Sequence, residues 1–157
     1  MEPKNDHPGV YMPPPVLYIT TFLAALLLQR MLPLRSIFFG TCVSTIIGWL
    51  ALITGLVFAF PALRQFFITK NTLVTIKPAH ALQTSGIYSI SRNPMYVGLL
   101  FLYSGLSLLA GNWWNFILLP LLVLLVQEYV IKREEKYLGR RFGKTYFDYR
   151  SRVRRWL

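Results

Sequence analysis

The sequence is poor in the residues that build disulfides and metal sites. It holds one cysteine, Cys42, and two histidines, His7 and His80, in 157 residues. A single cysteine excludes an intramolecular disulfide framework and a cysteine-rich metal site. The histidines have neither partners at metal-ligand spacing nor clustered acids nearby, so the sequence predicts no metal site. Because Cys42 lies within an apolar run, we expect it to be a small buried hydrophobic residue.

Acidic residues are also scarce, at six against seventeen Lys and Arg, which gives a net charge of +11. Nevertheless 54% of the residues are apolar, and the mean hydropathy is +0.44. Charge and hydrophobicity are therefore separated along the chain, as in membrane proteins. The first thirteen residues mix acids, a lysine and prolines, which does not fit a cleavable signal peptide.

Four apolar segments are long enough, or nearly long enough, to cross a bilayer. They are Pro15–Leu32, Ser36–Phe60, Met95–Ala110 and Trp113–Tyr129. Pro33 marks a turn after the first, Pro61 closes the second, and Gly111 with Asn112 signals a turn between the last two. We expect an all-α integral membrane protein with about four transmembrane helices in two hairpins. The fourth helix can continue past Glu128 into the polar tail.

Positive charge predicts the orientation in the membrane. Ten of the seventeen Lys and Arg lie from Lys132 onward, and the loop 62–93 holds four more. This bias predicts a multi-pass protein of the cytoplasmic (inner) membrane, with that loop and the C-terminus in the cytosol. The aromatic and basic tail suits anionic lipid headgroups better than nucleic acid. The loop 62–93 is about thirty residues long, and an unstructured connection of that length is uncommon unless it has a function.

The segment Arg92-Asn93-Pro94 is expected to start the third helix. Asparagine is a preferred N-cap, and proline at the first helical position costs no hydrogen bond. The N–H groups of Met95 and Tyr96 are then expected to be free to bind an anion such as a carboxylate, with Arg92 adding positive charge. The alternative is a well-capped helix with an arginine at the headgroups.

Three of the six acids, Glu128, Glu134 and Glu135, lie in one short stretch of predicted helix. Lys132 is at helical spacing to pair with Glu128, and Glu135 could pair with Lys132 or with the neighbours of Gly139. Glu134 has no such partner, because the adjacent Arg133 does not face it on a helix. It is therefore free to face a pocket and to meet a cation or ribose hydroxyls.

Several short motifs occur together in the second half of the chain. They are Leu82–Tyr88, Arg92–Gly98, Glu134-Glu135, and Phe142-Gly143 followed by Tyr146, Tyr149 and Val153. In order and spacing they resemble the isoprenylcysteine carboxyl methyltransferase family, including its bacterial and archaeal relatives and the phospholipid methyltransferases. The resemblance runs from about residue 72 to the C-terminus. It divides the chain into an N-terminal tail and hairpin, 1–61, and a methyltransferase-like core, 62–157.

The resemblance implies a membrane methyltransferase that uses S-adenosyl-L-methionine to methylate a lipophilic or amphipathic small acceptor, a carboxylate, thiol or amine. The cytosolic loop and the C-terminal helix would together form the cofactor pocket. The residues implied in cofactor binding are His80, Ala81, Leu82, Gln83, Tyr88, Asn93, Pro94, Met95, Tyr96 and Glu134. The catalytic residue stays open, with Asn93, Tyr96 and Arg92 as candidates.

Two positions depart from the family pattern. Asn93 stands where the family often has histidine, and asparagine cannot titrate near neutral pH. Val130 stands where the eukaryotic carboxyl methyltransferases place an arginine for the substrate carboxylate, and the closest arginine is Arg133. The second departure argues against a prenylcysteine acceptor.

Two other functions fit parts of the sequence. The chain could be a non-catalytic membrane protein of the same fold that binds lipid or a partner through its basic tail. It could also resemble sterol reductases, which bind a nicotinamide cofactor, although the short chain and the glutamate pair argue against that. The series Gly40, Gly48 and Gly55 could pack helices within one chain or between chains, so the oligomeric state stays open.

Overall fold

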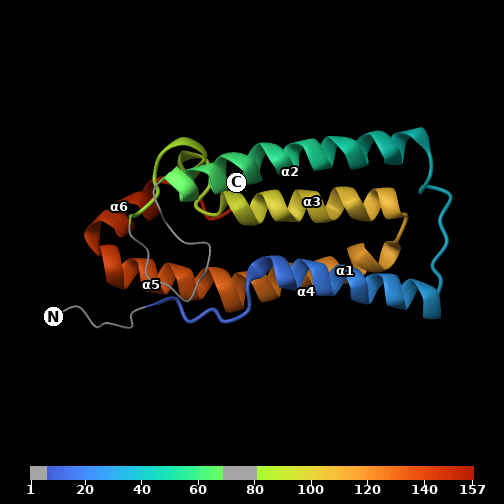
Figure 1. Ribbon diagram of the computed structural model, residues 1–157, viewed down its shortest axis with the longest axis horizontal. Helices are drawn as coiled ribbons and strands as arrows, with labels where there is room; N and C mark the ends of the chain where they lie inside the picture. Colours follow the sequence, from blue (N-terminus) through green and yellow to red (C-terminus); the bar gives the residue numbers. More distant parts are fainter. Residues whose placement is uncertain (1–6, 69–80) are drawn as a thin grey trace.

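The computed structural model describes residues 7–68 and 81–157. Every regular element in these two ranges is helical. In chain order they are α1 (Pro14–Met31), α2 (Cys42–Ile68), the 3₁₀ helix η1 (Gly86–Ser89), α3 (Pro94–Ala110), α4 (Trp113–Leu125), the π-helical η2 (Val126–Ile131), α5 (Lys132–Phe142) and α6 (Lys144–Arg152). In Figure 1, α2 lies beside α3 and α1 beside α4, forming an elongated bundle.

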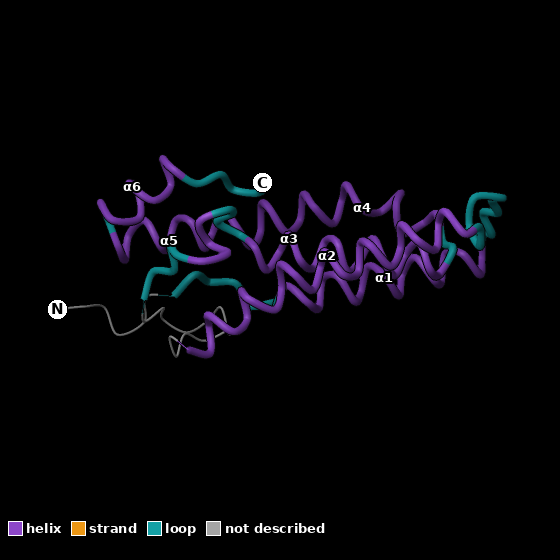
Figure 2. The backbone as a smooth tube through the Cα atoms, turned by 90° about the horizontal axis from the view of Figure 1, so that it is seen from above, coloured by secondary structure: helices purple, strands orange, loops and turns teal. Residues whose placement is uncertain are grey.

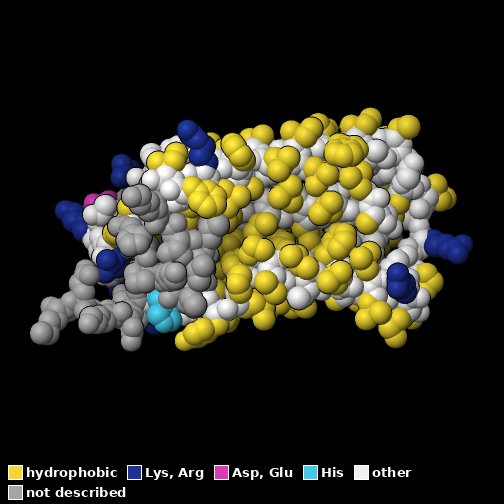
Figure 3. Space-filling model, in the orientation of Figure 1, with side chains coloured by type: hydrophobic (Ala, Val, Ile, Leu, Met, Phe, Trp, Pro, Cys, Tyr) yellow, Lys and Arg dark blue, Asp and Glu magenta, His cyan; other side chains and the backbone are white. Residues whose placement is uncertain are grey.

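The helix lengths and their surfaces make this an all-α integral membrane protein. The segments Pro14–Met31, Cys42–Ile68 and Trp113–Phe142 are long and apolar enough to cross a membrane, and α3 is apolar but one residue shorter than α1. Large apolar side chains of α2, such as Trp49, Ile53 and Val57, are more than half exposed. Figure 3 shows hydrophobic side chains covering the middle of the molecule, with Lys and Arg near its ends.

The second helix differs from the sequence prediction at both ends. It begins at Cys42 and continues through Pro61 to Ile68, so residues 62–68 belong to the helix and not to the predicted loop. Ala59 and Ala62, on either side of the proline, are both buried, so packing holds the helix across it. The late start leaves Cys42 exposed at the helix end, and the prediction that it is buried is wrong.

Glycines bring α2 and α3 into close contact. A Cβ at Gly98 would lie 2.7 Å from the backbone nitrogen of Ala59, and one at Gly105 would lie 2.8 Å from the carbonyl oxygen of Gly48. A Cβ at Gly55 would lie 2.9 Å from the carbonyl oxygen of Gly98. Small residues at such positions let helix backbones approach in a membrane. Gly48 and Gly55 therefore pack helices within one chain.

The turn between α3 and α4 holds the two hairpins together. Gly111 adopts a left-handed conformation with φ of 62°, and the Asn112 side chain accepts a hydrogen bond from the Trp114 N–H. The Asn112 amide also donates to the Ala25 carbonyl at 2.9 Å, and the Trp114 indole donates to the Leu32 carbonyl at 2.8 Å. The predicted turn is confirmed, and its side chains fix α1 to it.

The fourth predicted span continues into the tail, as expected. Helix α4 passes through the π-helical turn η2 directly into α5, making one helix from Trp113 to Phe142. Figure 2 shows α5 and α6 at one end of the bundle, where the chain also reaches its C-terminus. We call this end, formed by the Ser91–Asn93 turn, α5 and α6, the polar end.

The N-terminal segment lies against the helices that lead to the polar end. Val10 is 1% exposed and belongs to a core that includes Tyr96, Val130 and Ile131. The Arg133 side chain donates to the Gly9 carbonyl at 3.0 Å. Val130, which stands at the position of the family's carboxylate-binding arginine, is thus fully buried among apolar side chains.

Candidate functional site

The first turn of α3 meets α5 through a hydrogen bond between Tyr96 and Glu134. The Tyr96 hydroxyl donates to the Glu134 carboxylate at 2.8 Å. Tyr96 is 6% exposed, so the hydroxyl is shielded from solvent. A hydrogen bond to a charged acceptor contributes about 1.5–3 kcal/mol when it is well made. The bond therefore fixes the position of the acid that the sequence had left without a partner.

Glu134 has no cationic partner among the described residues, although α5 is rich in Lys and Arg. Lys132 pairs with Glu128 at 2.6 Å, as predicted, and Arg155 pairs with Glu135. A carboxylate can accept about four hydrogen bonds, and Tyr96 supplies one. Glu134 therefore keeps acceptor capacity for a cation or for hydroxyl donors of a ligand.

Tyr88, in η1, lies near the same carboxylate. Burial, and next the negative charge of Glu134, raise the pKa of the Tyr88 phenol, which stays neutral at physiological pH. The ring of Tyr88 lies 6.3 Å from that of Phe66 in α2, and its carbonyl accepts a 2.6 Å hydrogen bond from the Tyr149 hydroxyl. Elements α2, η1 and α6 thus hold Tyr88 beside the pair formed by Tyr96 and Glu134.

The start of α3 is built differently from the sequence prediction. Asn93 precedes Pro94, the first residue of the helix, but its side chain does not cap the helix. Its amide donates instead to the Arg155 carbonyl at 2.9 Å, and the Tyr96 N–H donates to the Asn93 carbonyl at 3.0 Å. The predicted helix start is confirmed, with Asn93 at the N-cap and Pro94 as the first helical residue, but the predictions of a side-chain cap bond and of a free Tyr96 N–H are wrong. Only the Met95 N–H keeps no acceptor among the described residues.

Arg92 is engaged in a largely buried ion cluster and does not stand free beside the helix. Its guanidinium lies 3.1 Å from the Glu135 carboxylate, with both side chains about 10% exposed. Arg155 binds the same carboxylate through two hydrogen bonds, of 2.9 and 2.7 Å. The predicted pairing of Glu135 with Lys132 is therefore wrong. A buried carboxylate needs partners that stay with it, and two arginines meet that need better than one exposed lysine.

The C-terminal segment completes this cluster and was not identified from the sequence. The backbone N–H of Arg92 donates to the backbone carbonyl of Arg154 at 2.9 Å. The Ser91 hydroxyl donates to the backbone carbonyl of Arg155 at 3.3 Å. Figure 1 shows the C-terminus ending beside the start of α3. A signal was available, since Glu135 is a rare acid in a basic tail. The sequence did not reveal which arginines it selects.

The remaining predicted residues lie on the approach to η1. The Gln83 side chain accepts a 3.1 Å hydrogen bond from Gln65 near the end of α2, while Ala81 is exposed and Leu82 is partly buried. Pro94 is buried and Met95 is partly buried in the first turn of α3. His80 lies outside the described residues. The structure thus brings Tyr88, Tyr96 and Glu134 together, with Met95 on the same turn as Tyr96.

Comparison with known proteins gives a family and two relatives. A family model described as phospholipid methyltransferase matches residues 43–145, which is more than half of the chain. Protein-S-isoprenylcysteine O-methyltransferase of Schizosaccharomyces pombe is 38% identical over 74 residues, covering 47% of this chain and 31% of that protein. An uncharacterized protein of Haemophilus influenzae is 36% identical over 63 residues, 40% of this chain and 100% of its own length.

These matches have clear limits in length. The chain spans about a third of the length of the Schizosaccharomyces pombe relative, 31%. No solved structure matches the chain. The family match includes α2, η1, α3 and α5, and therefore Tyr88, Tyr96 and Glu134.

Proposed function

This chain belongs to the phospholipid methyltransferase family, and on that premise we propose that it is a membrane methyltransferase dependent on S-adenosyl-L-methionine. The acceptor is a lipophilic or amphipathic small molecule. The observation that carries the proposal is Glu134, an acid held by Tyr96 at 2.8 Å with no cation of its own among the described residues. S-adenosyl-L-methionine carries a sulfonium and an ammonium group, which such a carboxylate can receive.

Other residues of the site suit the remaining parts of this cofactor. The start of α3 carries the positive end of a helix dipole, and the Met95 N–H is available as a donor for the cofactor carboxylate. Tyr88 and Tyr96 present aromatic rings beside Glu134. Residues Ala81 to Gln83 are assigned to the proposed pocket because they belong to the family motif.

The chain's own residues act mainly by binding and orientation. When bound, the cofactor supplies an electrophilic methyl group on its sulfonium. Holding this group in line with an acceptor replaces a bimolecular encounter by a positioned one, the type of catalysis that such a site can provide. Arg92 and Asn93 are both engaged in holding the turn before α3, so they act as positioning residues. An anionic acceptor needs no general base.

In this proposal, the acceptor and the cofactor reach the site by different routes. The lipophilic acceptor enters between helices from the bilayer, since α1 to α4 expose apolar side chains along their length. The polar cofactor enters at the polar end, for which the positive charge of the tail favours the cytosolic side. Val10 is buried in the same apolar cluster as Tyr96 and Val130 and adds apolar surface to this region.

A label-transfer experiment tests the activity. The full chain in detergent is incubated with methyl-labelled S-adenosyl-L-methionine and extracted membrane lipids, and the label in the organic phase is measured. We expect transfer with the wild type, loss with Glu134→Gln, and retention with Glu128→Gln, which alters an exposed acid of the same helical segment. If the purified protein has no affinity for S-adenosyl-L-methionine, the non-catalytic alternative replaces the proposal.

A further inference from the structure

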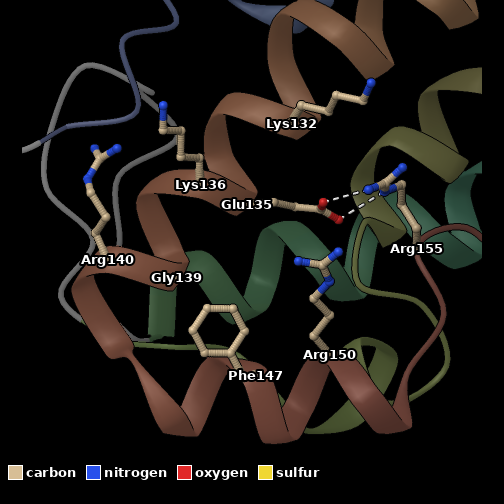
Figure 4. A pocket seen from close by; sticks show the side chains of 8 residues that line it. All are labelled: Lys132, Glu135, Lys136, Gly139, Arg140, Phe147, Arg150 and Arg155. Carbon is tan, nitrogen blue, oxygen red and sulfur yellow. Dashed lines mark hydrogen bonds and ion pairs between the residues drawn. The ribbon is translucent and has the colours of Figure 1, made fainter.

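A basic groove lies between α5 and α6, on the side of α5 that carries Glu135. Its volume is about 560 Å³, which is within the range of sites that bind small molecules. The residues that line it are Lys132, Glu135, Lys136, Gly139, Arg140, Phe147, Arg150 and Arg155. Five of these eight are Lys or Arg. Figure 4 shows side chains of both helices around the same space, with Arg150 rising from α6 toward Glu135.

The single acid of the groove does not cancel this charge. Glu135 already binds Arg155, and it also binds Arg92 from the turn before α3. Lys136 and Arg150 are both exposed, and neither makes a hydrogen bond or ion pair with another residue of the described ranges. Their donors remain available, so the groove can bind an anion with more than one negative oxygen.

The groove is also lined by Gly139 and Phe147, which carry no charge. Gly139 has no side chain, and a Cβ there would lie 3.4 Å from the Phe147 ring and 3.7 Å from the Tyr146 ring. These are ordinary van der Waals distances, so the two aromatic rings of α6 lie beside Gly139 of α5, and that of Phe147 lines the groove. Phe147 is 54% exposed and offers apolar surface beside the charges. Apolar surface next to cations suits an amphipathic ligand better than a free inorganic ion.

The position of the groove relative to the bilayer indicates the source of the anion. Trp113 begins the continuous helix that ends at Phe142, and Lys132 follows Trp113 by nineteen residues. At 1.5 Å per residue this is about 30 Å, the thickness of the hydrocarbon core. Trp113 suits the interface at one surface. Lys132 and the groove then lie at the level of the phosphates of the other leaflet.

We propose that this groove binds the phosphate headgroup of an anionic glycerophospholipid, held chiefly by Lys136 and Arg150. The site is separate from the proposed cofactor pocket, because Glu134 bonds to Tyr96 while Glu135 faces the groove. The proposal is independent of the proposed function. It adds a specific lipid site to a tail whose charge otherwise only orients the protein in the membrane.

The test is a lipid titration of the full chain in detergent. Phosphatidylglycerol or phosphatidylcholine is added, and the thermal unfolding midpoint reports binding. We expect phosphatidylglycerol to stabilise the protein more than phosphatidylcholine. A double variant, Lys136→Gln with Arg150→Gln, should bind phosphatidylglycerol at least about tenfold more weakly, since each cation near a bilayer surface contributes about 1 kcal/mol.

A matched control is Arg30→Gln with Arg35→Gln, which removes the same charge from exposed residues at the other end of the bundle. It should keep the affinity for phosphatidylglycerol. Equal weakening in both double variants, or no preference over phosphatidylcholine, overturns the proposal. So does displacement of the lipid by millimolar inorganic phosphate, because the ligand would then be a free anion. Binding of S-adenosyl-L-methionine should be unchanged in the groove variant, which separates this test from that of the proposed function.

Discussion

The hydroxyl of Tyr96 and the carboxylate of Glu134 meet at 2.8 Å although 38 residues separate them in the chain. The bond joins the first turn of α3 to α5 at the polar end of the bundle. It fixes an acid beside a helix start, and around it lie Tyr88 and the buried Val10 core. The proposed binding of S-adenosyl-L-methionine depends on this arrangement.

Removing the Tyr96 hydroxyl should loosen Glu134 without emptying the core. In Tyr96→Phe the ring stays in place and one hydrogen bond to a charged acceptor is lost. We expect the affinity for S-adenosyl-L-methionine to fall by roughly tenfold, corresponding to about 1.5 kcal/mol, as measured by calorimetry. Tyr103→Phe is the control, because Tyr103 bonds to Asn115 in the bundle and not to Glu134. An unchanged affinity in Tyr96→Phe would show that this bond does not organise the site.

The ion cluster at Glu135 should contribute strongly to stability. Glu135→Gln leaves Arg92 and Arg155 without their anion, and breaking a buried pair in this way costs about 3–5 kcal/mol. Because the cluster is only partly enclosed, we expect a loss near the lower end of that range in chemical unfolding. Glu128→Gln is the matched control, since the exposed pair with Lys132 contributes at most about 1 kcal/mol. Similar losses in both variants would contradict the role given to the cluster.

The contact between α2 and α3 should not tolerate a larger residue than glycine. In Gly98→Ala the added Cβ would lie 2.7 Å from the Ala59 nitrogen, so the two helices must separate. Overpacking of this kind costs about 1–3 kcal/mol. Thermal unfolding in detergent measures it. Leu106→Ala, at a half-exposed position of the same helix, should change the midpoint much less. A neutral Gly98→Ala would mean that the two helices are not held at this distance.

The N-terminal segment should stabilise the polar end through Val10. Val10→Ala removes two methyl groups from a fully buried site, and we expect a loss of about 2 kcal/mol. Tyr11, which is 73% exposed, provides the control as Tyr11→Ala. Equal unfolding midpoints in the two variants would show that the segment is not packed against Tyr96 in solution.

Local patterns allowed the helices and their nearest contacts to be predicted. The apolar runs predicted the four helices α1 to α4, and the spacing of four residues predicted the ion pair of Glu128 with Lys132. Pro61 was misinterpreted as a helix end. The packing of Ala59 against Gly98 of α3 and the burial of Ala62, which hold the helix past the proline, are tertiary effects. Periodicity within one helix cannot reveal contacts of that kind.

The candidate site was predictable only in part for the same reason. The family motifs indicated Tyr88, Tyr96 and Glu134, which do lie together. The partners of Glu135 come from 43 residues before it and 20 residues after it, and no local rule selects Arg92 and Arg155 among seventeen cations. Asn93 has the residue type of a helix cap, but its side-chain amide donates to the backbone carbonyl of Arg155 instead of capping the helix. The local sequence does not reveal this contact.

The most direct test of the proposed cofactor site is a calorimetric titration of S-adenosyl-L-methionine into the wild-type chain and into Glu134→Gln, both in detergent. Glutamine keeps the size of the side chain but not its charge. We expect measurable binding by the wild type and an affinity at least about tenfold lower in Glu134→Gln. The affinity of Glu128→Gln should equal that of the wild type. Equal affinity in the wild type and Glu134→Gln would contradict the assignment of this carboxylate to the cofactor.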